Sequence, residues 1–536
     1  MDVWAPPNEL HSIWMKDLWS ALTDQGIEIE DNPTESLLPA TVWKMKSEDW
    51  GMLARSAQHQ DCRWVGLWLD DLGDKLRATA ALSKNGRFLL VRTDLPSQAP
   101  SLPSHAPYFP GADRPERHAA DLFGVTFIGH LDSRRWIRHQ AWQAQDYPLR
   151  KAFPASGNPA ANTPPDRDYP FLHTQTPEVY EIPVGPVHAG IIEPGHFRFL
   201  AVGEAVLNLE ERLGYVHKGI EKIAEGRDAQ GLARLAGRVS GDTTVAHAWA
   251  ACMAMERAYA HMVPPRGLRL RAVLAERERI ANHLGDIGAI CNDVGFPFAH
   301  YQFSRLRELW LRDNAAWFGH RLLMDQVVPG GVATDLNGEA TDEMGLRVGE
   351  LGRELDELRP ILDANHSLQD RLVGAGILTY ETAKALGCLG YVGRASGFDC
   401  DLRRERPYGP YDELEIEAVS RTEGDVAARL NVRYDELYAS LGLLEQLLAR
   451  LHPGAIQSPW PTEPHAAEGL GVVEGWRGEI LCYVRFDREG RVARFFTRDP
   501  SVFNWPALEQ LIHGNIVPDF PLCNKSVNGS YAGHDL

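Results

Sequence analysis

The sequence predicts an α+β fold, in which a small N-terminal α/β domain precedes a larger, mainly helical domain with small β-sheets. Three observations support this prediction. Residues 1–154 mix strand-like and helix-like patterns, residues 155–177 are rich in Pro, Ala, Asn and Asp, and helical periodicity dominates residues 178–536. A chain of 536 residues is long enough for two domains with separate hydrophobic cores.

The first unit contains three recognisable elements. Residues 14–25 have the apolar spacing of an amphipathic helix, and residues 64–69 are typical of a short strand. Residues 77–92 predict a β-hairpin, because Asn85-Gly86 is a dipeptide that favours a two-residue turn. The Pro-rich segment 155–177 is predicted to be a linker.

The second unit begins with paired strands and continues with helices. Residues 197–200 and 205–209 flank Gly203 and are predicted to pair. Residues 269–294 carry apolar side chains at three- and four-residue spacing, which predicts one long helix. We also expect helices at 379–386 and 426–451, a helix end within 324–332 at Pro329-Gly330-Gly331, and a hairpin formed by 481–486 and 492–497.

Composition excludes several classes of protein. The net charge of −18 argues against a nucleic-acid partner. No apolar run reaches 18 residues and no secretory pattern is present, so we expect neither a membrane span nor a signal peptide in this sequence. The seven cysteines are scattered without a CxxC pair, which favours buried thiols in a reducing compartment over a disulfide framework.

A charged stretch of the first unit carries a family resemblance. It runs over residues 116–130 and continues with Arg134-Arg135 and residues 147–154, Tyr-Pro-Leu-Arg-Lys-Ala-Phe-Pro. These motifs resemble the signature of the small hydrophilic C-type subunit (30 kDa-type) of respiratory complex I. The resemblance implies an assembly domain without a cofactor. The residues agree, because charged and apolar side chains alternate without forming a ligand cluster, which favours a packing and docking surface.

The second unit resembles the D-type subunit of complex I and the large subunits of membrane-bound nickel–iron hydrogenases, including the formate-hydrogenlyase type. The ordered matches are residues 185–188, 195–199, 215–222, 319–321, 329–332, 394–397, 401–404, 407–411, 424–429 and 474–479. The two-part order resembles the chains of that family in which the C-type and D-type units are fused.

The metal motifs of the hydrogenases are altered here. The family pattern R-V-C-G-x-C reads Arg-Val-Ser-Gly-Asp-Thr over residues 238–243, and the C-terminal pattern reads Ser-Val-Asn-Gly-Ser-Tyr-Ala-Gly-His-Asp-Leu over 526–536. The resemblance therefore places the four lost cysteine positions at Ser240, Thr243, Ser530 and Gly533. Soft thiolates are what such a nickel site requires. We expect no metal bound by this chain, no hydrogenase activity and no C-terminal processing.

The complex I resemblance implies a quinone pocket in the same place, held by a histidine on the first hairpin and a tyrosine beside the first lost pair. His196 is the nearest match for the histidine, although its loop follows the hydrogenase pattern. The tyrosine position falls at about Gly241. A quinone remains possible, with His196 and Asp242 as candidate contacts.

The family fold would bring eight ionisable residues together in this pocket. They are His188, Glu193, His196, Asp242, His247, Arg477, His534 and Asp535, of which Arg477 matches the arginine over the hydrogenase metal. Such groups could move protons or sense the redox state of a neighbour. They could equally form a satisfied polar network that fills the abandoned cavity, because unpaired buried charge is costly.

Three further features have simple interpretations. Residues 276–279, Glu-Arg-Glu-Arg, are expected to form a charged helix face, and residues 403–406 an ion-paired loop at a subunit interface. Cys523 lies outside the ligand register and is expected to be a core thiol.

The resemblance implies partners and a place in the cell. We expect a small subunit with an iron–sulfur cluster beside the pocket, antiporter-like membrane subunits, and a peripheral position at the cytoplasmic face of the bacterial inner membrane. Three functions compete. The protein could couple redox or protonation changes to ion transport without nickel, it could be a quinone-reactive oxidoreductase subunit, or it could be a structural scaffold.

Overall fold

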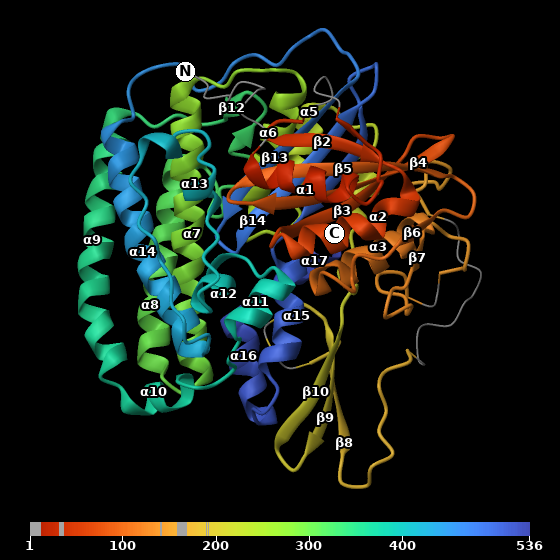
Figure 1. The fold of residues 1–536 in the computed structure, drawn as a ribbon. Helices are drawn as coiled ribbons and strands as arrows, with labels where there is room; N and C mark the ends of the chain where they lie inside the picture. The colour runs from red at the N-terminus through yellow and green to blue at the C-terminus, as the bar shows by residue number, and fades with distance from the viewer. Residues whose placement is uncertain (1–11, 32–36, 140–141, 158–168, 189, 191) are drawn as a thin grey trace.

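The computed structural model describes residues 12–31, 37–139, 142–157, 169–188, 190 and 192–536. Figure 1 shows a sheet-rich N-terminal part, in red and orange, packed beside a bundle of long helices in green, cyan and blue. A narrow sheet, in yellow, extends away from both. The predicted fold class is confirmed. Part of the predicted linker, residues 158–168, lies outside the described residues.

The N-terminal part is built on a five-stranded sheet in the order β1-β2-β5-β4-β3. The predicted helix is α1 (Ile13–Thr23), the predicted strand lies in β3 (Arg63–Asp71), and the predicted hairpin is β4 (Lys75–Lys84) with β5 (Arg87–Pro96). Asn85 and Gly86 both adopt positive φ angles, of 53° and 69°, as this turn requires. The other elements are β1 (Ile29–Asp31), β2 (Ala40–Met45), α2 (Trp50–His59), β6 (Ser101–Pro103), α3 (Asp113–Phe123) and β7 (Thr126–Ile128).

Long helices form the bundle. They are α7 (Pro265–Asp293), α8 (Pro297–Phe318), α9 (Gly338–Asp363) and α14 (Val426–Ala449), and α7 packs against both α8 and α14. Shorter helices surround them, namely α4 (Ile220–Ile223), α5 (Ala229–Ala236), α10 (His366–Leu372), α11 (Tyr380–Leu386), α12 (Gly390–Ala395), α13 (Leu402–Glu405), α15 (Ser501–Leu511), α16 (Phe520–Val527) and α17 (Tyr531–Asp535). The predicted helices at 269–294, 379–386 and 426–451 are confirmed.

A three-stranded sheet, β13 (Ala467–Gly475), β14 (Gly478–Phe486) and β15 (Val492–Arg498), lies directly on helix α6 (Thr244–Ala258). The contact is unusually close. A Cβ atom at Gly471 would lie 2.0 Å from the carbonyl oxygen of Ala250, and one at Gly469 would lie 2.0 Å from that of Ala254. Glycine is therefore required at both positions, and the contact fixes the β13–β14 turn beside the first turn of α6.

The yellow sheet joins β8 (Tyr180–Val184), β9 (His196–Val202) and β10 (Ala205–Arg212) in the order β10-β9-β8. Its β9–β10 turn confirms the pairing predicted around Gly203. Within the described residues, no helix is both long and apolar enough to cross a membrane.

Ion pairs join the N-terminal part to the rest of the chain. Arg485 donates to Asp70 over 2.5 and 2.8 Å, and Arg92 donates to Glu468 over 2.9 and 2.8 Å. Because both ion pairs are bidentate, they fix the orientation of the N-terminal part as well as its contact with the rest of the chain.

Three expectations met different outcomes. Residues 276–279 lie on helix α7 as expected, and all four charged side chains are buried. The segment 324–332 does not end a helix: α8 stops at Phe318, and Pro329-Gly330 instead turn the short hairpin β11 (Val327–Val328) and β12 (Gly331–Val332). Residues 403–406 are ion-paired as expected, since Arg403 contacts Asp401 and Arg404 contacts Asp399, but Leu402–Glu405 form the single turn of α13 rather than a loop.

Candidate functional site

The site is built around an ion pair between Asp242 and Arg477. Asp242 lies in the loop that leads into α6, and Arg477 lies in the tight β13–β14 turn. Arg477 donates from Nη1 to Oδ1 over 3.0 Å and from Nη2 to Oδ2 over 2.7 Å. Its Nε also donates to the carbonyl oxygen of Asn528 over 2.7 Å, so one guanidinium joins the α6 loop to the C-terminal segment.

The electrostatics of this pair favour the charged forms. Burial raises the pKa of a carboxyl group, but attraction to Arg477, with hydrogen bonds from Ser240 and Thr243, outweighs burial and holds the pKa of Asp242 below its usual range. The pKa of Arg477 is correspondingly raised by Asp242 against the effect of burial. The Asp242 side chain is 35% exposed and that of Arg477 only 4%, so the carboxylate is the open side of the pair.

The four positions that the resemblance assigned to the lost cysteines gather at this pair. Ser240 Oγ lies 3.0 Å from Ser530 Oγ and 2.5 Å from Asp242 Oδ1. Thr243 Oγ1 donates to the same carboxylate over 3.0 Å. Ser530 caps α17, because its Oγ accepts from the N–H of Gly533 over 2.9 Å. Two segments nearly 300 residues apart therefore meet with their side chains facing one another.

A buried aspartate occupies the space beside the fourth position. A Cβ atom at Gly533 would lie 2.6 Å from Asp499 Cγ, so no side chain fits there unless Asp499 moves. Asp499 accepts from His247 Nε2 over 2.9 Å and from the N–H of Ser501 over 2.8 Å. His247 and Asp499 are both fully buried. Burial raises the pKa of Asp499, but His247 outweighs it and the pKa is lowered.

Sequence reasoning missed Asp499. Its only local signal is the Asp-Pro-Ser sequence that starts α15, where an aspartate normally caps a helix. Asp499 does accept from the N–H of Ser501, although the N-cap of α15 is Pro500, whereas its contact to His247 joins residues 252 positions apart.

The predicted residues of the first hairpin lie beside this centre rather than in it. Glu193 Oε2 accepts from the N–H of Ala532 over 3.1 Å. His196 lies at the start of β9, where its Nδ1 donates to the carbonyl oxygen of Gly185 over 2.8 Å and its ring lies 5.0 Å from that of Phe171. Burial lowers the pKa of His196. Among the described residues, its Nε2 and both ring nitrogens of His188 are buried without a hydrogen-bond partner.

The last two predicted residues contact a different region. His534 Nδ1 lies 2.9 Å from Asp535 Oδ1, and Asp535 Oδ2 accepts from the N–H of Val216 over 3.1 Å. The ring of His534 packs edge-on against Trp136 of the N-terminal part. The eight predicted residues therefore do not form one cluster. Asp242 and Arg477 form the centre, and His247 pairs with Asp499 beside Gly533. Glu193 contacts the C-terminal helix α17, which itself contains His534 and Asp535, while His188 and His196 lie beside Gly185.

These residues do not fit a nickel centre. The four aligned positions offer three hydroxyl groups and a glycine, and no thiolate. The hydroxyls of Ser240 and Thr243 already donate to Asp242. Within the part of the chain that the structure describes, no group of three His, Cys, Asp or Glu side chains is arranged to hold a metal ion. Such a hard, hydrogen-bonded oxygen set is unsuited to a metal that thiolates select.

Fold and site together define a protein like a hydrogenase large subunit, joined to a second, smaller domain. Three family models match the chain: the 30 Kd subunit of respiratory-chain NADH dehydrogenase over residues 44–159, nickel-dependent hydrogenase over 218–285, and the 49 Kd subunit of respiratory-chain NADH dehydrogenase over 293–462. The hydrogenase match spans the loop that contains Ser240 and Thr243.

Characterised relatives cover most of the chain. Formate hydrogenlyase subunit 5 of Escherichia coli is 31% identical over 450 residues, which are 84% of this chain and 79% of the relative. The C/D subunit of the NADH-quinone oxidoreductase of Bacteroides thetaiotaomicron is 30% identical over 522 residues, or 93% of this chain and 95% of the relative. The chain belongs to the family that unites fused complex I C/D subunits with the large subunits of energy-converting hydrogenases.

A solved structure supports the same placement. A chain of the membrane-bound sulfane sulfur reductase, an archaeal respiratory membrane complex, superposes with a TM-score of 0.63 at 27% identity. The superposition covers 68% of this chain and all of the other.

Proposed function

We propose that this chain is the nickel-free large subunit of a membrane-associated complex, in which the Asp242–Arg477 pair couples redox or protonation changes in a partner to ion transport. The observation that carries the proposal is the position of the pair. It lies between Ser240, Thr243 and Ser530, the aligned positions of the lost ligands, and hydrogen bonds from two of them stabilise its carboxylate. In this proposal, a fixed charge pair takes the place that the metal has in the hydrogenases.

The solvent exposure of the Asp242 carboxylate supports this role. Because Asp242 is about one-third exposed while Arg477 is buried, a charge that changes in a neighbouring subunit would act first on the carboxylate. Moving or protonating Asp242 would free Arg477, which also holds the C-terminal segment through Asn528. A local electrostatic event would then shift an element that spans the site.

The proposed partners follow the family. An iron–sulfur small subunit would dock over Asp242, and antiporter-like membrane subunits would carry the ion. The complex would lie at the cytoplasmic face of the bacterial inner membrane, with this chain peripheral and held by its partners. Membership of a family whose members work in multisubunit membrane complexes supports this arrangement.

The test is an Asp242→Asn substitution in the complete complex, purified and reconstituted into vesicles. Asparagine keeps the shape but removes the charge, so we expect ion movement to fall at least tenfold while the complex still assembles. The matched control is Asp363→Asn, which removes an exposed carboxylate that pairs with Arg359 on α9. Unchanged ion movement in Asp242→Asn would favour a structural scaffold instead.

A second candidate, a quinone-reactive subunit, is favoured by one observation. His196 Nε2 is buried and lacks a hydrogen-bond partner among the described residues, so it could donate to or accept from a bound ligand. A photoreactive quinone applied to the membrane-embedded complex would label peptides near His196 or Asp242 if this candidate is right. Labelling that native quinone does not compete away would argue against it.

A further inference from the structure

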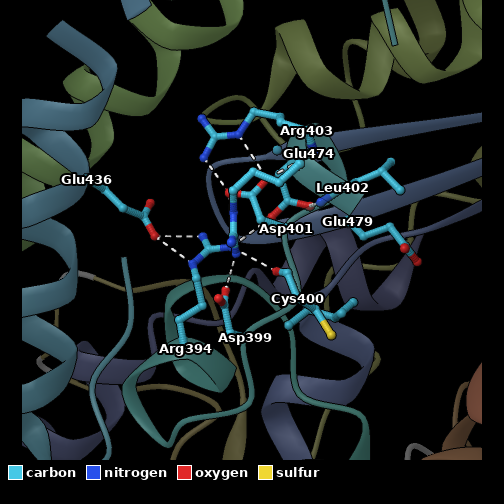
Figure 2. Close-up of polar contacts among 12 residues, drawn as sticks. Arg394, Asp399, Cys400, Asp401, Leu402, Arg403, Glu436, Glu474 and Glu479 are labelled. Carbon is cyan, nitrogen blue, oxygen red and sulfur yellow. Dashed lines mark hydrogen bonds and ion pairs between the residues drawn. The ribbon is translucent and has the colours of Figure 1, made fainter. Parts of the chain in front are cut away.

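A second ionic cluster lies deeper in the molecule, between the helix bundle and β13. Figure 2 shows part of it: Arg394 stands between Glu436 on one side and Glu474 and Asp401 on the other. Ion pairs extend the cluster to the eight residues Glu276, Arg279, His283, Arg394, Asp401, Arg403, Glu436 and Glu474, all of them buried.

The charges in this cluster do not balance. It contains four carboxylates, three guanidinium groups and one histidine, so it is neutral only when one proton is bound to a carboxylate or to His283. A net charge in a buried, low-dielectric region is strongly unfavourable. The cluster should therefore hold one titratable proton.

The contacts of the four carboxylates indicate which of them binds the proton. Glu276 contacts Arg279 at 3.2 Å and Arg403 at 3.1 Å, and Tyr411 and Ser440 also donate to it. Glu436 accepts from Arg394 over 2.6 and 2.9 Å and from His283 over 2.7 Å.

The other two carboxylates, those of Asp401 and Glu474, differ in how many hydrogen bonds they accept from arginine. Asp401 accepts from Arg403 over 2.7 and 3.0 Å. Among the described residues, the Glu474 carboxylate contacts a single guanidinium, that of Arg394 at 3.2 Å, and otherwise accepts only from the N–H of Leu402 over 3.2 Å. Glu474 is the carboxylate least stabilised as an anion.

Glu474 also lies directly behind the wall of a cavity. A cavity of about 710 Å³ opens between the N-terminal part and the bundle, and its lining includes Phe88, Trp249, Leu402 and Tyr408. The N–H of Leu402 donates to the Glu474 carboxylate, and the N–H of Glu474 donates to the Tyr408 hydroxyl over 2.8 Å. Two residues of the wall therefore touch Glu474, and the cavity is large enough to contain water.

We propose that the Glu474 cluster is a proton-binding site that exchanges one proton with water in the interdomain cavity. A proton from the cavity adds to the Glu474 carboxylate and forms the neutral acid, and its release to water restores the anion. His283, whose Nδ1 is buried without a partner among the described residues, lies at the other end of the cluster. Its ring packs on Trp476, whose indole N–H donates to the Asp242 carbonyl over 3.0 Å. The role in ion transport rests on the proposed function, whereas proton binding does not.

The charged neighbours of Glu474 are consistent with this assignment. Arg394 on α12, with Asp401 and Arg403 at α13, faces it from one side, and Arg279 of α7 donates to its carbonyl oxygen rather than to its carboxylate. Glu479, its cross-strand partner on β14, forms ion pairs with Arg63 and Arg498, which favour its ionised form. Burial first, and then repulsion by Asp401, raise the pKa of Glu474 to about 7 despite the nearby arginines.

The test is infrared spectroscopy of the purified membrane complex in the wild type and in Glu474→Gln, with difference spectra between about pH 6 and pH 8, on either side of the raised pKa of Glu474. We expect a protonated-carboxyl band that disappears on raising the pH in the wild type and is missing in Glu474→Gln. The matched control is Glu468→Gln on the same strand, because Arg92 holds the pKa of Glu468 below its usual range in spite of burial. The band should persist in this control.

A second measurement guards against a misfolded variant. Glutamine resembles the protonated acid, so the thermal midpoint of Glu474→Gln should equal that of the wild type only below the unfolded-state pKa of glutamate, about 4.3, and should exceed it at about pH 8. A band of equal size in Glu474→Gln, or no titrating band in the wild type, would overturn the proposal. If the band behaves as expected while Asp242→Asn leaves ion movement intact, the proton site stands and the proposed function fails.

Discussion

At the scale of single residues, the site depends on how Arg477 and Asp242 stabilise one another. Arg477 is buried and reaches a carboxylate, a threonine hydroxyl and a backbone carbonyl at once. Lysine could not reproduce this planar set of contacts, because its ammonium is a single point charge. The bidentate geometry explains why the carboxylate stays ionised although most of its surroundings exclude water.

Removing the guanidinium should therefore destabilise the fold. We expect Arg477→Met to lower the free energy of unfolding by about 1–3 kcal/mol, because Asp242 keeps its charge and loses its cation. The Arg477→Met/Asp242→Asn double variant should regain part of that loss. Chemical denaturation of the full-length chain measures both. A double variant as unstable as the sum of its single variants would mean that the two residues act independently.

The Asp242–Arg477 pair also makes the stability of the fold depend on pH, and the direction of this dependence follows from the pKa shift of Asp242. The folded-state pKa of Asp242 lies below its unfolded value of about 3.9, so the pair stabilises the fold fully above that value. The stabilisation is lost as the pH falls through the folded-state pKa. The difference in stability between wild type and Asp242→Asn should be largest near pH 7 and should shrink below about pH 4. A difference that stays constant over this interval would contradict the ionised pair.

At the scale of elements, glycines determine how closely the segments around the site approach. Gly471 lets β13 lie against the backbone of α6, and Gly533 lets α17 lie against Asp499. In both places a methyl group would overlap atoms that cannot yield easily, a helix carbonyl in one case and a buried, hydrogen-bonded carboxylate in the other.

Replacing Gly533 tests whether a fourth ligand could fit. We expect Gly533→Ala to lower the free energy of unfolding by about 1–3 kcal/mol, because Asp499 must move away from His247. Gly442→Ala, in α14, is the control, since nothing lies within 4 Å of its added methyl group and alanine favours helix. An unchanged stability for Gly533→Ala would show that the cavity retains room for a ligand side chain.

Local patterns predicted many of the elements but not the burial of their charges. The Asn85-Gly86 hairpin and the helix over 269–294 follow from turn chemistry and periodicity, which act within a few residues. The polar stripe of that helix was expected to form a charged face, but its burial was not predicted, because a sequence cannot reveal that α14 brings Glu436 and Arg433 against it. For the same reason Asp499, paired with His247 across the fold, remained hidden.

The site itself could be predicted only in part. Ser240, Thr243, Ser530 and Gly533 were located by resemblance, and the structure brings them together. Asp242 and Arg477 meet as expected, whereas Asp535 contacts Val216 and His217, and His534 contacts Trp136. Neighbours in sequence can face opposite sides of one short helix, and α17 has only five residues.

At the scale of the whole molecule, charged contacts hold the N-terminal part against the β13–β14 strands. Arg92–Glu468 and Arg485–Asp70 both cross this boundary with bidentate geometry. The interdomain cavity lies along the same boundary, next to the Glu474 cluster. The fused chain thus holds in one body the charge pair, the proton-binding cluster and its access to water.

The most direct test of the nickel-free account is the nickel content of a complex that moves ions. Mass spectrometry of the purified complex, prepared from cells grown with added nickel and reconstituted to measure ion movement, gives both quantities on one sample. We expect full ion movement with far less than one nickel per chain. Stoichiometric nickel, or ion movement that appears only when nickel is bound, would contradict the claim that the Asp242–Arg477 pair has replaced the metal.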